Sequence, residues 1–146
     1  MLKIETATLH QMDAVRVLFR EYQQALNIDL CFQGFEQELV TLPGKYTSIL
    51  LAERYAGCVA LRPFDHETAE MKRLYVRPRY RGTGLGRALT EAILEEARTR
   101  HYTAIRLDTL PQMTTAIALY RSLGFRDIPP YCTNPFPGAL FLELQL

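Results

Sequence analysis

The segment from Glu70 to Arg87, EMKRLYVRPRYRGTGLGR, constrains the fold more than any other part of the chain. Residues 71–76 have the apolar and β-branched character of a short strand, and Pro78 ends it because proline has no N–H for a strand ladder. Three glycines follow: Gly82, Gly84 and Gly86. They lead directly into ALTEAILEEA, a strong helix former. The segment therefore predicts a strand, a glycine loop and a helix N-terminus in immediate succession.

A glycine loop that opens a helix is suited to binding an anion. Glycine lets the backbone approach a ligand closely, and the first N–H groups of a helix have no partner within it. From Met71 to Arg87 the chain carries six Lys or Arg residues and no acid. The segment therefore predicts a site for an anionic group such as a pyrophosphate.

The glycine spacing separates this loop from other phosphate-binding loops. It is not a Walker A loop, because no Gly-Lys-Ser/Thr follows. Its spacing is G-x-G-x-G, whereas dinucleotide-binding folds have G-x-G-x-x-G directly after the strand. Asp108, about twenty residues further on, keeps the dinucleotide interpretation open as a minor alternative. The pattern that fits is Arg-x-x-Gly-x-Gly, formed by Arg81, Gly84 and Gly86.

The composition is that of one ordinary globular domain, expected to span residues 1–146. Hydrophobic residues make up 48% and charged residues 23% of the 146, and the net charge is +1. A nucleic-acid-binding protein is more often strongly basic, so this charge argues against one. No apolar run has the length of a membrane span and no signal pattern begins the chain, so we expect a cytoplasmic protein. The three cysteines and three histidines have no metal-ligand spacing, so we expect free thiols and no metal.

Hydrophobic periodicity predicts the remaining elements. The expected strands are 2–9, 48–53, 57–61, 71–76, 104–107, 125–128 and 139–146. The expected helices are 10–26, 35–42, 85–97 and 111–123. A helix between strands 71–76 and 104–107 implies a right-handed parallel crossover, whereas the early hairpin of strands 48–53 and 57–61 and the final hairpin are antiparallel. The predicted fold class is therefore α/β, with a central mixed, twisted sheet flanked by helices on both faces.

A second motif follows the glycine loop at a distance of one helix and one strand. The sequence LDTLPQMTTAIALYRSLGF ends in Ala-x-x-Leu-Tyr-x-x-x-Gly-Phe, formed by Ala116, Leu119, Tyr120, Gly124 and Phe125. Together with Arg-x-x-Gly-x-Gly, this resembles the GNAT superfamily of acyl-CoA-dependent N-acetyltransferases over nearly the whole chain. One departure is Met113, where the family often has an asparagine that contacts the cofactor.

The resemblance implies acetyl-CoA as the cofactor, bound in a wedge where strand 71–76 and the next strand separate. The expected cofactor-binding residues are Leu74, Tyr75, Val76, Arg79, Arg81, Gly82, Thr83, Gly84, Leu85, Gly86, Arg87 and Met113. It also implies Glu70 as general base, eleven residues before Arg81, and Tyr120 as the acid that protonates the leaving thiolate. Segments that line the acceptor cleft in such folds supply the expected substrate-binding residues Tyr22, Phe32, Phe35, Tyr131 and Asn134.

The implied function is transfer of an acetyl group to a primary amine of a small molecule or peptide by direct attack, with no nucleic-acid or membrane partner. The oligomeric state is left open between monomer and homodimer. Two alternatives are a catalytically inactive acyl-CoA-binding module, and a nucleic-acid-binding protein that uses the basic stretch 72–87. As individual residues, Tyr120 also fits a core tyrosine, Glu70 a surface carboxylate, and Lys72, Arg73 and Arg77 a solvated strand face. The cysteines fit small buried hydrophobic residues.

Overall fold

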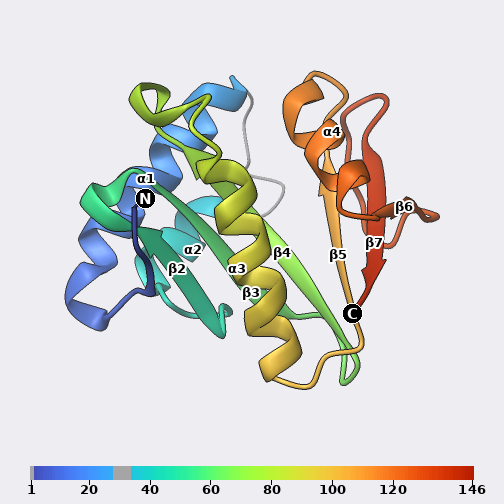
Figure 1. Cartoon of the computed structure of the whole chain (residues 1–146), viewed down its shortest axis with the longest axis horizontal. Helices are drawn as coiled ribbons and strands as arrows, with labels where there is room; N and C mark the ends of the chain where they lie inside the picture. Colours follow the sequence, from blue (N-terminus) through green and yellow to red (C-terminus); the bar gives the residue numbers. More distant parts are fainter. Residues whose placement is uncertain (1, 28–33) are drawn as a thin grey trace.

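A seven-stranded mixed sheet forms the centre of the molecule, in the order β1-β2-β3-β4-β5-β7-β6 (Figure 1). The structure is a computed structural model and describes residues 2–27 and 34–146. Its strands are β1 (Ile4–Thr6), β2 (Ser48–Ala52), β3 (Gly57–Pro63), β4 (Thr68–Val76), β5 (Ala104–Thr109), β6 (Arg126–Asp127) and β7 (Leu140–Gln145). Its α-helices are α1 (Met12–Leu26), α2 (Phe35–Thr41), α3 (Leu85–Thr99) and α4 (Thr114–Ser122). This arrangement confirms the predicted fold class.

The ends of α1 follow from local chemistry. The backbone N–H of Thr8 donates to the side-chain oxygen of Gln11 at 2.9 Å, which closes the 3-10 turn Leu9–Gln11 ahead of the helix. At the other end the chain turns at Asn27, whose φ of 54° is left-handed, a conformation that asparagine tolerates better than most residues. Both boundaries agree with the predicted first helix.

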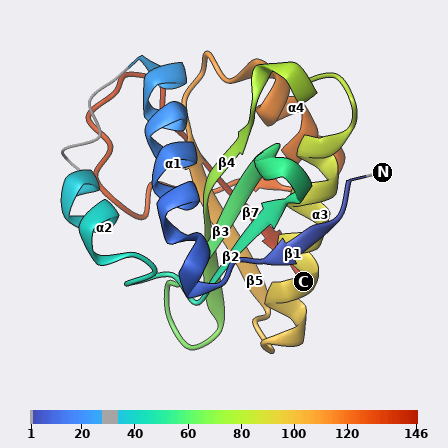
Figure 2. The ribbon, with the colours of Figure 1, turned by 90° about the vertical axis from the view of Figure 1, so that its left-hand side faces the viewer.

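Helices cover both faces of the sheet (Figure 2). On one face, α1 and α2 bury residues such as Phe19 and Leu39 against β2 and β3. On the other, α3 buries an apolar stripe that includes Leu89 and Ile93, and α4 adds Tyr120. Each fully buried large aliphatic or aromatic side chain contributes about 1.5–3 kcal/mol, so the two clusters fix the helices to the sheet. No α-helix within residues 2–27 and 34–146 is long and apolar enough to cross a membrane.

The parallel strands β4 and β5 separate soon after they begin. They pair only from Thr68 to Glu70, opposite Ala104 to Arg106, although both strands continue for several residues. Figure 1 shows them close together at their starts and apart at their carboxyl ends. The edge of β4 that faces β5 therefore has no strand partner beyond Glu70 among the described strands.

A one-residue bulge in β4 accompanies this separation. Lys72 lies opposite Ala60 of β3, but Tyr75 lies opposite Cys58, so β4 holds one extra residue between these pairs. Arg73 within the bulge has a left-handed φ of 61°. The bulge places Lys72 and Arg73 on the same face of the sheet, where strict alternation would separate them.

Two details differ from the sequence-based expectation. The fourth helix begins at Thr114 rather than at Pro111, because residues 110–113 form a turn in which Met113 N–H donates to the Leu110 carbonyl at 3.0 Å. Strand β7 pairs with β5 as well as with β6 and so lies between them. A hairpin of the last two strands was expected, but the insertion of β7 beside β5 was not.

Candidate active site

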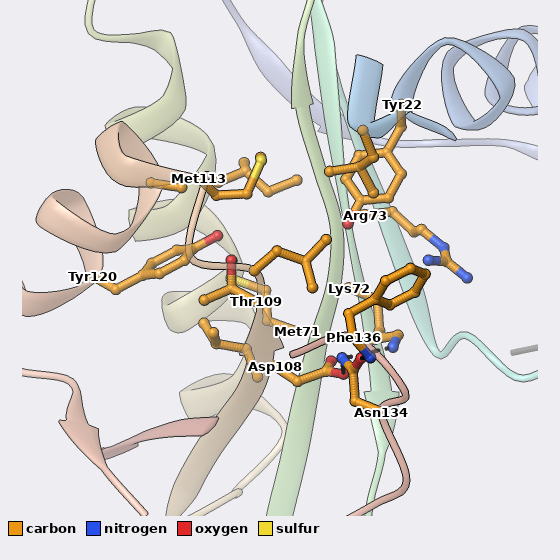
Figure 3. A pocket seen from close by; sticks show the side chains of 15 residues that line it. Tyr22, Met71, Lys72, Arg73, Asp108, Thr109, Met113, Tyr120, Asn134 and Phe136 are labelled. Atoms are coloured by element: carbon orange, nitrogen blue, oxygen red, sulfur yellow. Dashed lines mark hydrogen bonds and ion pairs between the residues drawn. The ribbon is translucent and has the colours of Figure 1, made fainter. Parts of the chain in front are cut away.

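A cavity lies in the wedge between β4 and β5 and has a volume of about 60 Å³. Its walls come from α1, β4, β5, α4 and the loop before β7 (Figure 3). The lining residues are Tyr22, Leu26, Met71, Lys72, Arg73, Leu74, Leu107, Asp108, Thr109, Leu110, Met113, Ala116, Tyr120, Asn134 and Phe136. The structure thus brings together residues from β4, the second motif and the loop before β7.

The glycine loop leaves a helix N-terminus open. Gly82 and Gly84 have φ values of 77° and 87°, and a Cβ at either would meet no atom within 4 Å. The first helical backbone bond of α3 joins Ala88 N–H to the Gly84 carbonyl, and no described side chain caps this end. The N–H groups of residues 85–87 therefore have no partner within the helix and are available to an anion.

The basic side chains around this loop are only partly committed to other groups. Arg81 donates from Nε to the Val76 carbonyl at 3.0 Å and lies over the Tyr75 ring. Arg87 donates to the Ser122 hydroxyl at 2.8 Å, and Arg79 stacks beside Tyr80. All three belong to the segment that precedes or begins α3, so they surround the open amides with positive charge. Thr83 binds the Tyr80 carbonyl through its hydroxyl and tightens the turn.

The predicted cofactor residues of β4 divide between its two faces. Leu74 lines the cavity, and Val76 packs against the core beneath α3. Tyr75 faces the other way and donates its hydroxyl to Glu21 at 3.2 Å. For Tyr75, therefore, only the backbone lies along the open strand edge.

Tyr120 is both a core residue and a cavity residue. Its side chain packs against Phe125 and is 5% exposed, while its hydroxyl points towards the cavity, as Met113 also does (Figure 3). Burial, and secondarily the nearby Tyr22, raises the pKa of Tyr120 well above its ordinary value. The hydroxyl therefore keeps its proton at neutral pH and can donate it.

Glu70 lies in a row of alternating charges across four strands. Arg62, Glu70, Arg106 and Glu143 occupy successive paired positions of β3, β4, β5 and β7. The carboxylate accepts a 2.7 Å hydrogen bond from the Tyr131 hydroxyl and lies 3.5 Å from an Arg62 nitrogen. Glu70 is 5% exposed, so it is not a surface carboxylate, and it lies beside the cavity without lining it.

Asp108 and Lys72 are cavity residues that the sequence interpretation did not assign to the site. Lys72 Nζ lies 3.6 Å from Asp108 Oδ1 and 4.0 Å from Glu70 Oε2. Asp108 also accepts a 3.2 Å hydrogen bond from the Asn134 amide. A usable signal was present, because Asp108 follows an apolar strand at its carboxyl end, where ligands of parallel strands gather.

Of the expected substrate-binding residues, the structure brings three together. Tyr22 and Asn134 line the cavity, and Tyr131 lies beside it on Glu70. Phe35 is 1% exposed and belongs to the core beneath α2 rather than to the cavity. Phe32 lies outside the described residues.

The expectation of a solvated face at residues 72–77 is wrong for Lys72 and Arg73. The Lys72 side chain is 10% exposed, and the Arg73 side chain is 1% exposed. Arg73 donates two hydrogen bonds to Glu38, at 2.9 and 3.1 Å, and lies against the rings of Tyr22 and Phe35. The bulge turns Arg73 towards α2, whereas Lys72 keeps the regular register opposite Ala60 and is buried in the cavity wall beside Asp108.

Of the two described cysteines, one is buried as expected and the other is exposed. Cys58 is fully buried as expected, and burial raises the pKa of its thiol to about 12. Cys132 is exposed, contrary to expectation. Its pKa is also raised, first by partial burial and then by the charge of Asp108. Cys31 lies outside the described residues. Neither described thiol is poised to form a thiolate nucleophile at neutral pH.

Comparison with known proteins identifies the family. The sequence model of the acetyltransferase (GNAT) family matches residues 11–125. An uncharacterised N-acetyltransferase of Schizosaccharomyces pombe is 38% identical over 144 residues, covering 92% of this chain and 88% of the relative. The chain therefore belongs to the acetyltransferase (GNAT) family and is an acyltransferase.

Solved structures agree with this assignment at the level of the fold. An acetyltransferase from Streptococcus agalactiae superposes with a TM-score of 0.80 at 23% identity, covering 99% of this chain and 98% of the other. A putative acetyltransferase from Salmonella typhimurium, solved with its cofactor acetyl-CoA, superposes with a TM-score of 0.69 at 22% identity, covering 99% and 94%. Because acetyl-CoA is the acyl donor of the GNAT family, the expected cofactor is confirmed at family level.

Proposed function

We propose that this protein transfers the acetyl group of acetyl-CoA directly to a primary amine of a small molecule or peptide. One observation carries the proposal. Strands β4 and β5 stop pairing at Glu70, and the wedge that they open has free helix amides towards one end and the Tyr120 hydroxyl on its wall. A long ligand with an anionic end and a reactive end matches such a site.

The residues around the wedge fit the chemical groups of acetyl-CoA. The amides of residues 85–87, with Arg79, Arg81 and Arg87 beside them, would hold the pyrophosphate and the remaining phosphate. The unpaired edge of β4 at Leu74 and Val76 would pair with the amides of the pantetheine arm like an added strand. Met113 supplies an apolar contact where an asparagine is frequent in the family. The bound thioester would supply the acetyl group in activated form.

Removal of a proton from the acceptor is the costly step that the protein must assist. An alkylammonium has a pKa near 10.4, so its neutral, nucleophilic form lies about 4–5 kcal/mol uphill at pH 7. We assign this role to Glu70. Because Glu70 lies beside the cavity, the proton would reach it through the Tyr131 hydroxyl or a water molecule.

Tyr120 would act on the leaving group, the thiolate of coenzyme A. A thiol has a pKa near 8.5, so a thiolate is already a fair leaving group and proton donation helps moderately. The raised pKa of Tyr120 keeps its hydroxyl protonated until it is needed. Direct attack by the amine requires no acetylated cysteine, in keeping with a buried Cys58 whose pKa is about 12.

The test is release of coenzyme A from acetyl-CoA over a panel of amines, with wild type and Glu70→Gln compared. We expect Glu70→Gln to lower kcat/KM by about 10²-fold, because general-base catalysis contributes at least that much, with acetyl-CoA affinity retained. Glu67→Gln is the matched control, since Glu67 is an exposed carboxylate three residues away.

Two outcomes would favour the alternatives. Tight binding of acetyl-CoA without acetylation of any amine would indicate an inactive acyl-CoA-binding module. Nucleic-acid affinity that falls steeply with salt, and depends on the basic residues between 72 and 87, would indicate the nucleic-acid-binding function.

A further inference from the structure

We propose that the acceptor is an amino acid or another small amine that also carries a carboxylate, and that Lys72 binds this carboxylate. The inference rests on the proposed function and names the substrate class of the same site. The observations that carry it are the unsatisfied donors of Lys72, the charge balance around it, and the size of the cavity.

Lys72 is a buried cation without a hydrogen-bond acceptor in the described part of the chain. Its side chain is 90% buried and lines the cavity. Its two ion pairs, at 3.6 Å to Asp108 and 4.0 Å to Glu70, are both longer than a hydrogen bond. An ammonium has three N–H donors, and because Lys72 lines the cavity these donors are open to water or to a ligand there. Of the acceptors that a ligand can offer, an anionic oxygen is the strongest.

The carboxylates near Lys72 already have other partners. Glu70 accepts from Tyr131 and pairs with Arg62 at 3.5 Å. Asp108 Oδ2 accepts from the Asn134 amide, whereas its Oδ1 has only the distant Lys72 nitrogen. Asp108 Oδ1 and the Lys72 ammonium therefore both have hydrogen-bonding capacity left for a ligand. The two residues lie beside each other in the cavity wall (Figure 3).

The charge balance selects a ligand without net charge. Arg62 and Lys72 oppose Glu70 and Asp108, so the four side chains sum to zero. A simple alkylammonium would add an uncompensated positive charge to this buried group, which is costly. A zwitterion adds none, and its two ends match the pair: its ammonium fits Asp108 Oδ1 and its carboxylate fits Lys72. Arg73 does not compete for the carboxylate, because Glu38 already engages two of its nitrogens.

The enclosed part of the cavity is small, about 60 Å³ between Tyr22, Asn134 and Tyr120. An acceptor that presents its amine and its carboxylate together to this space, as an amino acid does, fits it. An amino group at Asp108 Oδ1 would lie beside Lys72, whose Nζ is 4.0 Å from Glu70, the base that we assign to it.

The experiment compares amino acids that carry a primary amine, each with its own amide, in wild-type enzyme. The amide has the same amine and nearly the same size but lacks the negative charge. The amine of an amino acid amide has a pKa of about 7.7–8.0 and is more often neutral at pH 7, so amine reactivity alone would favour the amide. We expect the reverse: at least one amino acid should exceed its amide in kcat/KM by about tenfold to a hundredfold, the value of a charged hydrogen bond.

Variants of Lys72 locate the effect. Lys72→Met keeps the length of the side chain without its charge, so it should raise KM for the amino acid about tenfold or more, whereas KM for the cationic amide should not rise. Lys72→Arg should restore part of the preference. Lys3→Met, an exposed position, changes the net charge equally and should alter neither substrate. Equal use of acid and amide by wild type, or an equal loss of both in Lys72→Met, would overturn the inference.

A binding measurement separates this inference from the proposed function. The complex of the enzyme with coenzyme A is titrated calorimetrically with L-alanine and with alaninamide. Carboxylate-dependent binding without turnover of any amine would support the role of Lys72 and contradict catalysis. Turnover of amines without any preference for a carboxylate would support catalysis and contradict the role of Lys72.

Discussion

The Tyr131 hydroxyl donates a 2.7 Å hydrogen bond to Oε2 of Glu70, and so ties the loop before β7 to the middle of the sheet. The phenol ring is held edge-on by Phe64 and Phe141, with centroids 5.3 and 5.4 Å away, and Arg106 stacks on it. Burial, and then the charge of Glu70, raises the pKa of Tyr131 far above its ordinary range. The phenol is therefore a permanent donor to this carboxylate at neutral pH.

Tyr131→Phe removes only this hydrogen bond and keeps the ring packing. We expect kcat/KM for the acceptor to fall about tenfold or more, because a hydrogen bond to a charged group contributes about 1.5–3 kcal/mol and here it orients the assigned base. Acetyl-CoA affinity should not change. Tyr55→Phe is the control, since Tyr55 is exposed on the 3-10 turn Glu53–Tyr55 that follows β2. Steady-state kinetics at saturating acetyl-CoA measure the effect, and wild-type kcat/KM in Tyr131→Phe would leave Tyr131 with a packing role alone.

Gly84→Val tests the anion site at the start of α3. Gly84 has a φ of 87°, which a β-branched residue adopts only with strain, and its open side is where a ligand would approach. We expect acetyl-CoA binding to be lost or reduced by at least about a hundredfold, measured by calorimetry.

The chain offers a matched control in Gly34. It has a φ of 68°, stands at the N-cap of α2 and likewise has no atom within 4 Å of its Cβ position. Gly34→Val should have a similar effect on stability and leave acetyl-CoA affinity intact. If both variants lose the cofactor equally, the loss reflects backbone strain and the proposed site is wrong.

Tyr120→Phe tests the assigned acid. The variant keeps the contact with Phe125 and removes the hydroxyl that faces the cavity. We expect kcat to fall about a hundredfold, at the low end for general-acid catalysis because a thiolate leaves readily. The affinity for acetyl-CoA and the melting temperature should stay close to wild type. Unchanged turnover by a folded Phe variant would return Tyr120 to the core alone.

The Glu38–Arg73 pair predicts a component of acid sensitivity. Burial by itself would raise the pKa of Glu38, but the hydrogen bonds and charge of Arg73 outweigh it and hold the pKa below its ordinary value of 4.5. The ionised form is therefore the stabilising one. Its contribution is complete above pH 4.5 and is lost as the pH falls through the lowered pKa of the folded state. Urea unfolding at a series of acidic pH values measures this loss.

Substitutions separate the pair from general acid effects. Glu38→Leu alone leaves Arg73 as an unpaired buried charge and should reduce the free energy of unfolding by about 3–5 kcal/mol at pH 7. Glu38→Leu combined with Arg73→Met should recover most of this loss and lack the acid-dependent component. A double variant that is no more stable than Glu38→Leu would show that the bulge, rather than the charge pair, needs these residues.

Local sequence patterns predicted most of the fold because each rule acts over a few residues. The glycine loop and the apolar stripe that follows it correctly predicted strand β4 and helix α3. The position of β7 between β5 and β6 depends on contacts between distant strands, which no local pattern records. Pro111 was expected to open a helix, but residues 110–113 form a turn first, so a residue that fits a helix start does not by itself fix where the helix begins.

The site was predicted less completely than the fold. Tyr22, Tyr120 and Asn134 line the cavity. Of these, Tyr120 belongs to the second motif, whereas Tyr22 and Asn134 were expected only from the segments that line the acceptor cleft in similar folds. Lys72 was assigned to solvent because strand side chains were assumed to alternate, and Asp108 was noted only for a different kind of fold. The residue that broke the alternation is Arg73, whose left-handed φ of 61° is not signalled by its type. One such bulge changes which side chains share a face, and the error falls at the site itself.

The short pairing of β4 with β5 has a mechanical consequence. Among the described strands, the ladder between β4 and β5 joins the part of the sheet containing β1 to β4 to the part containing β5, β7 and β6 through three residue pairs, whereas β5 pairs with β7 over six. The two halves of the sheet are therefore paired only near the starts of β4 and β5 and are separate at the carboxyl ends of these strands. A ligand that binds along the open edge of β4 and touches α4 would link the two halves of the sheet. Because such a ligand binds only the folded chain, it raises the free energy of unfolding, and this increase grows with the logarithm of the ligand concentration. A substrate bound in the wedge would thus add one more link between the two halves of the sheet.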